Sequence, residues 1–479
     1  MRNRFFSDAP VEFDETLSKT LKVASAPETT ALQYRVELIT PLFGGGTMPG
    51  DVDLLMPFRA KSIRGHLRFW WRLLAHEGVF AKPSWWNNND DAAPEEHDRF
   101  KRWERQVWGG VRGSEVVASA VGLEVVNKKQ ITPVEYEQAR FRAAEIFRGA
   151  EYALFSAQSQ ADRLTRKLMS ANEGDLASFD LVVSIKAAQA AGNAVDQVKE
   201  TIRCWATFGG IGSRTRRGLG SLKVTECTEN DTQGIVCVDL TPSFGVPKFG
   251  NHDAPGLRVA KGNAPGTADQ CWKSAVGVLR DFRQGPGIAR VRKGGMPGRS
   301  FWPEPDAIRV ATGQHLNAVV NGVLRQHIPA NNFAAAHSNG LFPRAAFGLP
   351  IVVQFKDKQI RDRATGQLIP HIDKNKCDPD QVSIEAIDAK RMASPLIIKA
   401  CVQSDGNFYP IAVLLPSSRE ITDKLTVKIA GKMVPAWTTK MANDFQAEKA
   451  FAPIQAAVGG VLSAHDPLEA FLNYFKQRL

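Results

Sequence analysis

The chain lacks the features that mark secreted, membrane-spanning or zinc-binding proteins. Its six cysteines are scattered over 479 residues without a C-x-x-C pair, which predicts reduced thiols in a cytoplasmic protein rather than a disulfide framework or a zinc site. No run of about 18 apolar residues occurs, so we expect no membrane span. The first six residues, Met1 to Phe6, contain no apolar signal core.

The sequence also lacks the common motifs of catalytic sites. No His-Asp-His cluster, H-E-x-x-H motif or nucleophile elbow is present. His66 could act as a general base for RNA cleavage, and Asp51 with Asp53 could hold a metal or position a ribose hydroxyl. However, a lone histidine on a packed helix is usually structural, and metal sites need more convergent ligands. We therefore predict no catalytic residue, no metal and no cofactor, with a guide-RNA-processing endoribonuclease as the alternative.

Basic residues outnumber acidic ones, 61 to 50, which gives a formal net charge of +11. A surplus of this sign favours an anionic partner, especially where the basic residues are clustered. Two segments show such clustering, and both lie in the first half of the chain.

The first basic segment is the loop Phe208–Leu222, where five glycines alternate with three arginines and no acidic residue intervenes. Glycine allows close approach to backbone amides, and arginine matches phosphate oxygens two at a time. The loop fits neither the P-loop motif nor the dinucleotide fingerprint, because a helix precedes it and a strand follows it. We predict RNA contacts, rather than a solvated glycine turn, for Gly209, Gly210, Gly212, Ser213, Arg214, Arg216 and Arg217.

The second basic segment is a predicted helix after Ser62, which we expect to cap it. Ile63, Leu67, Trp70 and Leu74 form one apolar stripe, whereas the basic residues recur on another face. Five basic residues and no acidic one lie between 57 and 74, although an exposed helix normally mixes signs. The alternative is a basic surface helix packed through its tryptophans. We assign to RNA Arg59, Lys61, Arg64 and Arg68.

The order of elements predicts the fold class. A strand at Tyr34–Thr40 runs into a glycine loop, where Gly44 and Gly45 join the predicted site, and then into the basic helix. Later, a helix at Val195–Phe208 runs through the glycine-arginine loop into a strand at Ser221–Glu226. This order suits a β-α-β-β-α-β unit with both loops on one side of the sheet. We predict an α+β protein of tandem ferredoxin-like (RRM-like) domains with insertions.

We divide the chain into an arm (1–30), a first domain (31–232) with an insertion near 76–106, and a second domain (233–479). In the insertion, Trp85 and Trp86 either stack on bases or anchor the loop. The other elements expected are a helix at Glu95–Val107, strands at Phe179–Lys186 and Val236–Leu240, a helix at Ala268–Phe282, strands at Pro350–Phe355, Pro395–Val402 and Tyr409–Leu415, and a helix at Pro467–Gln477.

A third basic and glycine-rich segment, Gly285–Arg299, lies in the second half. Arg290, Arg292 and Lys293 either line the same polyanion track or belong to a mobile loop. Nearby, Trp302 is expected to be a packed anchor rather than a base-stacking ring.

Three motifs together resemble the RAMP superfamily of CRISPR proteins, and most of all the Cmr-one subunits of type III-B effector complexes: Thr40–Gly46, Ser62–Trp71 and Gly209–Gly220. The clear resemblance covers residues 31–226. Looser similarity covers Phe301–Pro305, Phe342–Pro350 and Arg391–Leu396, and residues 1–30 resemble nothing known.

The resemblance implies a non-catalytic subunit at the head of the Cmr complex, near the three-prime end of the guide RNA (crRNA). Its implied partners are crRNA, target RNA and other RAMP subunits, with no membrane and no small-molecule cofactor. Target cleavage would belong to the repeated backbone subunit. A pure assembly subunit without RNA contact is a second alternative.

Overall fold

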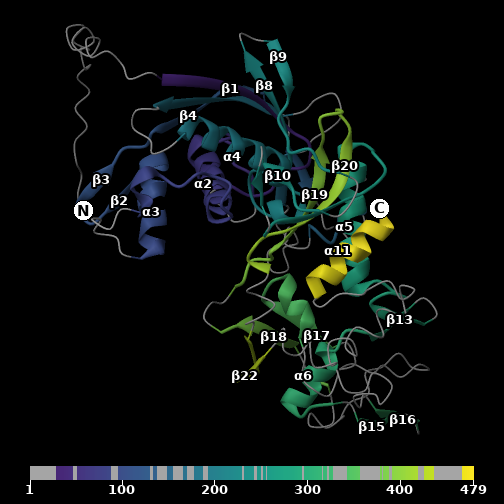
Figure 1. Cartoon of the computed structure of the whole chain (residues 1–479). Helices are drawn as coiled ribbons and strands as arrows, with labels where there is room; N and C mark the ends of the chain where they lie inside the picture. The colour runs from purple at the N-terminus through teal and green to yellow at the C-terminus, as the bar shows by residue number, and fades with distance from the viewer. Residues whose placement is uncertain are drawn as a thin grey trace, which may run out of the picture. The chain divides into compact units, whose positions relative to one another are not determined.

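The structure is a computed structural model of the whole chain (Figure 1). The residues it describes are 29–46, 51–87, 95–129, 133–136, 148–154, 166–169, 177–186, 193–228, 231–241, 245–249, 252–254, 256–293, 296–315, 317–320, 323–326, 342–355, 378–379, 381–387, 391–418, 426–435 and 467–479. The predicted arm, residues 1–30, lies outside them except for Thr29 and Thr30, which begin the first strand.

The first sheet has five strands in the order β4-β7-β1-β8-β9. Their bounds are Thr29–Leu38 (β1), Val121–Lys129 (β4), Ser178–Lys186 (β7), Leu222–Thr228 (β8) and Asp231–Ile235 (β9). Helix α2 (Ala60–His76) follows β1, and helix α4 (Ala194–Phe208) connects β7 to β8. The strand order β8-β1-β7-β4 is the one expected of a β-α-β-β-α-β unit. A mixed α+β protein is confirmed, whereas the tandem arrangement stays a prediction.

Alternation of apolar residues fixes which face of this sheet is buried. Tyr34, Val36 and Leu38 are buried along β1, and Val36 lies opposite Val224 of the antiparallel neighbour β8. On α2 the predicted apolar stripe is buried as expected. The predicted cap is wrong, because the helix begins at Ala60 after Arg59, which leaves Ser62 exposed within the first turn.

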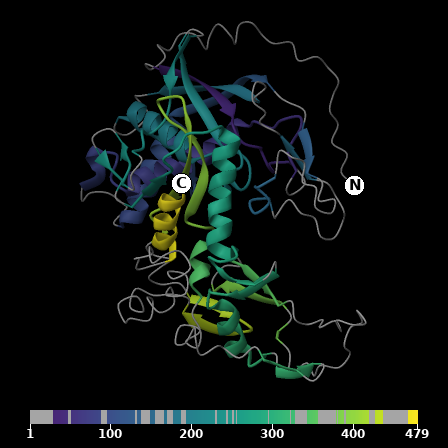
Figure 2. The ribbon, with the colours of Figure 1, turned by 90° about the vertical axis from the view of Figure 1, so that its right-hand side faces the viewer.

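A second sheet has three strands in the order β12-β20-β19, namely Arg258–Lys261, Phe408–Leu414 and Leu396–Val402. Helix α5 (Ala268–Gln284) contacts β19 and β20, and helix α11 (Pro467–Arg478) contacts α5 (Figures 1 and 2). All seven residues of β19 are buried, because β19 also contacts the loop after α4 and strand β8. Strand β19 therefore packs against elements of both halves of the chain: helix α5 of the second half, and the loop after α4 and strand β8 of the first.

A third sheet, with the order β17-β18-β21-β22, has its own small core. Its strands are Ile351–Gln354, Gln381–Ala386, Thr426–Ile429 and Lys432–Pro435. Helix α6 (Glu304–Thr312) and the 3-10 helix η7 (Pro343–Phe347) contribute to this core. Arg309 of α6 joins Asp306 and Asp378 at 2.7 and 2.8 Å, and these side chains are largely buried. The ion pairs satisfy charges that would otherwise be costly to bury.

The remaining elements of the described residues are one helix, two 3-10 turns and five hairpins. They are η1 (Ser84–Asn87), α3 (Glu96–Trp108), β2 (Gly110–Arg112) with β3 (Glu115–Val117), β5 (Pro133–Tyr136) with β6 (Arg166–Met169), η5 (Thr215–Arg217), β10 (Lys248–Phe249) with β11 (His252–Asp253), β13 (Arg290–Lys293) with β14 (Met296–Ser300), and β15 (Asn317–Val320) with β16 (Val323–Gln326).

The chain separates into two compact units, and the smaller one contains residues 82–122 and 183–196 with the start of β1. It includes α3, as predicted, and both tryptophans of the predicted insertion. Trp86 is buried, with its ring centroid 5.8 Å from that of Trp103. Trp85 donates from Nε1 to Gln106 Oε1 at 3.1 Å. Both rings therefore anchor η1 to α3. The predicted domain boundary near residue 232 stays a prediction.

The predicted strand at Val236–Leu240 is wrong. Val236 N still donates to Val224 O of β8 at 2.8 Å, but beyond it the chain is irregular, because the next amides find side-chain partners outside any sheet. Val238 N donates to Thr207 Oγ1 at 2.8 Å, and Leu240 N donates to Gln403 Oε1 at 2.6 Å. Alternation alone could not reveal these side-chain acceptors.

Replacement of Phe282 by alanine should destabilise the larger unit strongly. Its fully buried ring lies 5.3 Å from those of Phe471 and Tyr474 and 5.5 Å from that of Trp302, measured between centroids. Loss of such a ring costs about 3–5 kcal/mol. Urea unfolding should show this loss, whereas Val310→Ala, at a half-exposed position of α6, should change stability little. Equal effects of the two variants would contradict the packing described.

Candidate RNA interface

The two glycine loops form one structure, which we call the double loop (residues 40–46 and 209–221). The hydroxyl of Thr40 donates to Gly218 O at 2.6 Å and accepts from Ser221 N at 2.8 Å. Gly220 N donates to Pro41 O at 2.9 Å. The prediction that both loops lie on one side of the first sheet is confirmed, since they are directly bonded to each other.

The two loops approach each other closely, which explains why glycine occupies these positions. A Cβ on Gly44, which has a φ of +71°, would lie 2.4 Å from Ser213 Oγ. A Cβ on Gly212, with a φ of +79°, would lie 2.5 Å from Leu42 Cδ1. No side chain fits at such separations. The glycines are therefore required by the packing of the two loops against each other.

The amides of the glycine-arginine loop also serve this packing. Gly209 N donates to Trp205 O at 2.8 Å, Ile211 N to Gly220 O at 3.0 Å, and Ser213 N to Phe43 O at 2.6 Å. These bonds hold the loop against α4 and the first glycine loop. The assignment of Gly44, Gly209, Gly210, Gly212 and Ser213 to RNA stays a prediction, because internal bonding accounts for these residues without a ligand.

The three arginines of the loop have different surroundings. Arg214 is exposed, adopts a left-handed conformation with a φ of +58°, and donates to Ala153 O at 3.5 Å. Arg216 is half-exposed and donates to Ser394 O. Its guanidinium also lies over the ring of Phe69 on α2, 5.9 Å from the centroid. Partial burial lowers the pKa of both groups.

Arg217 is directed into the protein. Its guanidinium donates to Leu396 O and Arg216 O at 3.3 Å and to Phe347 O at 3.5 Å. Burial lowers the pKa of Arg217 to about 10. Its own carbonyl accepts a bond of 2.8 Å from Trp272 Nε1. Arg217 therefore attaches the double loop to β19, η7 and α5, and its contact with RNA stays a prediction.

Sequence reasoning missed Lys399, which holds the glycine-arginine loop in place from strand β19. The side chain is fully buried in β19 and donates from Nζ to Gly209 O at 2.7 Å. Burial lowers its pKa to about 8, against an opposing effect of the nearby Cys401. A lysine inside the apolar run Leu396–Val402 was the signal available, because such a position is otherwise reserved for apolar side chains.

Helix α2 carries a basic face beside the double loop. Arg59 donates to Gly45 O and lies 4.0 Å from Asp53 Oδ2. Lys61 is exposed, and Arg64 and Arg68 are half-exposed one turn apart. Burial, and then the positive charge of Arg68, lowers the pKa of Arg64. Arg216 meets this helix at Phe69, so loop and helix contribute to one surface. We call Lys61, Arg64, Arg68 and Arg216 the basic face.

The third predicted basic segment forms the hairpin β13-β14. Burial, and then the charge of Arg344 in η7, lowers the pKa of Arg290. The side chains of Arg292 and Lys293 lie outside the described part of the structure. Trp302 is fully buried and donates to Phe282 O at 3.2 Å, so it is the packed anchor expected.

The absence of a catalytic role for His66, Asp51 and Asp53 stays a prediction. Burial lowers the pKa of His66. Asp53 Oδ1 accepts bonds of 3.1 and 3.0 Å from the amides of Leu55 and Met56. Within the described ranges, no three His, Cys, Asp or Glu residues converge as metal ligands. The helices of these same ranges include none long and apolar enough to cross a membrane.

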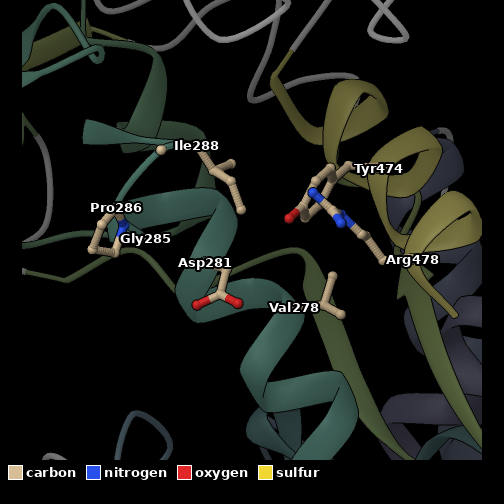
Figure 3. Close-up of a pocket in the computed structure, with 8 residues that line it drawn as sticks. Val278, Asp281, Gly285, Pro286, Ile288, Tyr474 and Arg478 are labelled. Atoms are coloured by element: carbon tan, nitrogen blue, oxygen red, sulfur yellow. The ribbon is translucent and has the colours of Figure 1, made fainter. Parts of the chain in front are cut away.

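A pocket of about 600 Å³ lies between the end of α5 and α11 (Figure 3). Asp281, Ile288, Tyr474 and Arg478 are among its lining residues. The Arg478 guanidinium lies 5.2 Å from the centroid of the Tyr474 ring. The pocket shares no residue with the double loop or the basic face.

Replacement of Lys399 by methionine should change how stability depends on pH. The folded pKa of about 8 lies below the ordinary 10.5. The unfolded chain therefore binds more protons between these values, and wild-type stability rises with pH across that window. Relative to the variant, the wild type should gain up to ~3 kcal/mol. Urea unfolding at pH 7 and at pH 10 measures the difference. Parallel pH dependences of the two proteins would contradict a buried, titrating Lys399.

Residues 35–223 match the family model described as the RAMP superfamily. The CRISPR system Cmr subunit Cmr1-2 of Pyrococcus furiosus is 28% identical over 197 residues, which are 40% of this chain and 93% of that protein.

Solved structures similar to this chain have low identity. The apo crystal structure of Cmr1 from Pyrococcus furiosus is 14% identical with a TM-score of 0.37, over 80% of this chain and 87% of that one. A chain of the type III-B Cmr-beta cryo-EM structure bound to cognate target RNA is 12% identical with a TM-score of 0.36, over 88% and 99%. On the family match and the curated relative, residues 35–223 are similar to the RAMP superfamily, and the chain resembles Cmr1 proteins.

Proposed function

We propose that this chain is a non-catalytic RNA-binding subunit of a Cmr-type CRISPR effector complex. It binds the backbone of guide RNA, caps the head of the complex near the three-prime end of the crRNA, and lies close to target RNA. Other RAMP subunits of the complex are its protein partners. The fold that carries this function is a tandem of ferredoxin-like domains. The curated relative is named as a Cmr subunit, which supports the complex.

The basic face is the observation that carries the proposal. Arg64 and Arg68 lie one turn apart on α2, where two like charges destabilise a helix. Burial, and then the charge of Arg68, lowers the pKa of Arg64, and the second of these effects is the repulsion between the two guanidiniums. A phosphate between the two guanidiniums would relieve it. Arg216 extends the same charge onto the double loop.

The double loop determines how precisely these charges are placed. Its glycines, the Thr40 hydroxyl and the buried Lys399 hold the loop against α4 and β19. Arg216 is consequently fixed beside Phe69. Binding through phosphates positions a nucleic acid without reading its sequence, so a guide of any sequence would be accepted.

Removal of the basic face should weaken RNA binding in a salt-dependent way. We expect a variant with Arg64→Ala, Arg68→Ala and Arg216→Ala to lose affinity for single-stranded RNA. The slope of log affinity against log salt should fall by roughly 0.7 for each phosphate that the variant no longer neutralises. Fluorescence anisotropy over a salt series measures both quantities.

A control variant removes two basic side chains outside the basic face. Arg280→Ala with Lys476→Ala alters two exposed positions on α5 and α11, and should leave affinity and slope nearly unchanged. Arg217 is omitted from the variant because its guanidinium bonds inside the protein. If the triple variant kept full affinity for RNA, the basic face would not be part of the RNA-binding site. Absence of binding by the wild type would favour the assembly subunit.

The purified protein should leave RNA intact. Repeat RNA incubated with and without divalent metal should keep its length on a denaturing gel, because the described residues offer no convergent metal ligands. Cleavage that disappears in a His66→Ala variant would instead identify a processing endoribonuclease.

A further inference from the structure

An exposed apolar tip lies between the first glycine loop and α2. Leu54, Leu55 and Met56 are 40%, 88% and 50% exposed. Three consecutive apolar side chains in water are unfavourable without a partner, because each forgoes the free energy of burial. We call these three residues the apolar tip.

The segment that presents the tip is held in a fixed shape. Asp53 Oδ1 accepts from the amides of Leu55 and Met56 at 3.1 and 3.0 Å, which forms the turn. Gly46 N donates to Asp51 O at 2.7 Å. Arg59 contacts both the glycine loop and the turn, since it donates to Gly45 O and lies near the Asp53 carboxylate. The turn that presents the tip is therefore attached to the double loop through Asp51 and Arg59.

Basic residues follow the tip in the sequence, whereas Asp51 and Asp53 precede it. The Asp53 carboxylate accepts from the amides of the tip and lies 4.0 Å from Arg59. Lys61 is the second residue of α2, five positions after Met56, and no acidic residue occurs from 57 to 74. Phe69 on the same helix is 38% exposed, with the Arg216 guanidinium over its ring. Apolar side chains beside cations suit a ligand that alternates apolar rings with negative charges, which is a single-stranded nucleic acid.

A protein partner fits these observations less well. Three side chains cover far less than the roughly 800 Å² per partner of a standard protein interface. The basic rim would also require an acidic partner. Unstacked bases present apolar faces, and side chains such as Leu and Met act as wedges between base steps in other nucleic-acid complexes.

We infer that the apolar tip contacts the faces of RNA bases while the basic face binds the adjoining phosphates. This inference rests on the proposed function, because it requires RNA on the basic face. The tip adds affinity for any base, since apolar packing does not read hydrogen-bonding edges. It also separates neighbouring bases where it lies between them.

The test compares two ligands of equal length and charge: single-stranded RNA and an oligomer with abasic sites in place of its bases. We expect the wild type to bind RNA more tightly than the abasic oligomer. Leu55→Ser with Met56→Ser should lower the affinity for RNA about tenfold and leave that for the abasic oligomer unchanged. Because both positions are exposed, this variant should fold, which thermal unfolding verifies.

The matched control is Val111→Ser with Met433→Ser, since these side chains are also exposed, at 68% and 66%. It should bind both ligands as the wild type does. As a second readout, 2-aminopurine in the RNA should brighten on binding to the wild type and to this control, and less on binding to the tip variant.

Other outcomes separate the tip from the proposed function. If the tip variant binds both ligands normally while Arg64→Ala with Arg68→Ala weakens both, the inference about the tip is wrong and the proposed function stands. Normal RNA binding with loss of association to purified Cmr subunits would assign the tip to a protein partner and overturn the inference. If the wild type binds neither ligand, both are wrong.

Discussion

The structure around the candidate site depends on hydrogen bonds of one side chain, the hydroxyl of Thr40. It donates to Gly218 O and accepts from Ser221 N, and so joins two loops more than 170 residues apart in the sequence. Both bonds are buried, where an unmade bond would cost the desolvation of a polar group. Glycine is needed on either side because the chains approach too closely for a Cβ. Everything proposed for RNA is built on this junction.

Two cations, the buried Lys399 and the partly buried Arg217, connect the double loop to the second half of the chain. Lys399 donates to Gly209 O, and Arg217 donates to Leu396 O and Phe347 O. Charged groups are costly to bury, and here backbone carbonyls compensate part of that cost. The loop therefore has a defined conformation, with Arg217 inside the protein and Arg216 beside α2. Of these adjacent arginines, Arg217 therefore supports the loop, whereas Arg216 lies on the surface proposed to bind RNA.

The proposed surface then combines two kinds of interaction. The basic face supplies charges for phosphates, and the apolar tip supplies hydrophobic area for bases. They are connected by Arg59, which bonds to Gly45 O in the double loop and lies near Asp53 in the turn that shapes the tip. A polyanion that alternates phosphates and bases matches both at once, which neither a metabolite nor a purely acidic protein surface does.

Local periodicity was enough to predict much of the fold. The apolar stripe of α2, the helices α3, α4, α5 and α11 and the strands β1, β7, β8, β19 and β20 follow from alternation or helical spacing. The three motifs also predicted the family and the meeting of the glycine loops. Only the tertiary structure decided the role of each residue: that Arg217 points inward, that Lys399 supports the loop, that Trp86 is an anchor, and that Val236–Leu240 forms no strand. Periodicity reports which face of an element is buried, whereas the partner of a polar group depends on distant segments that folding brings together.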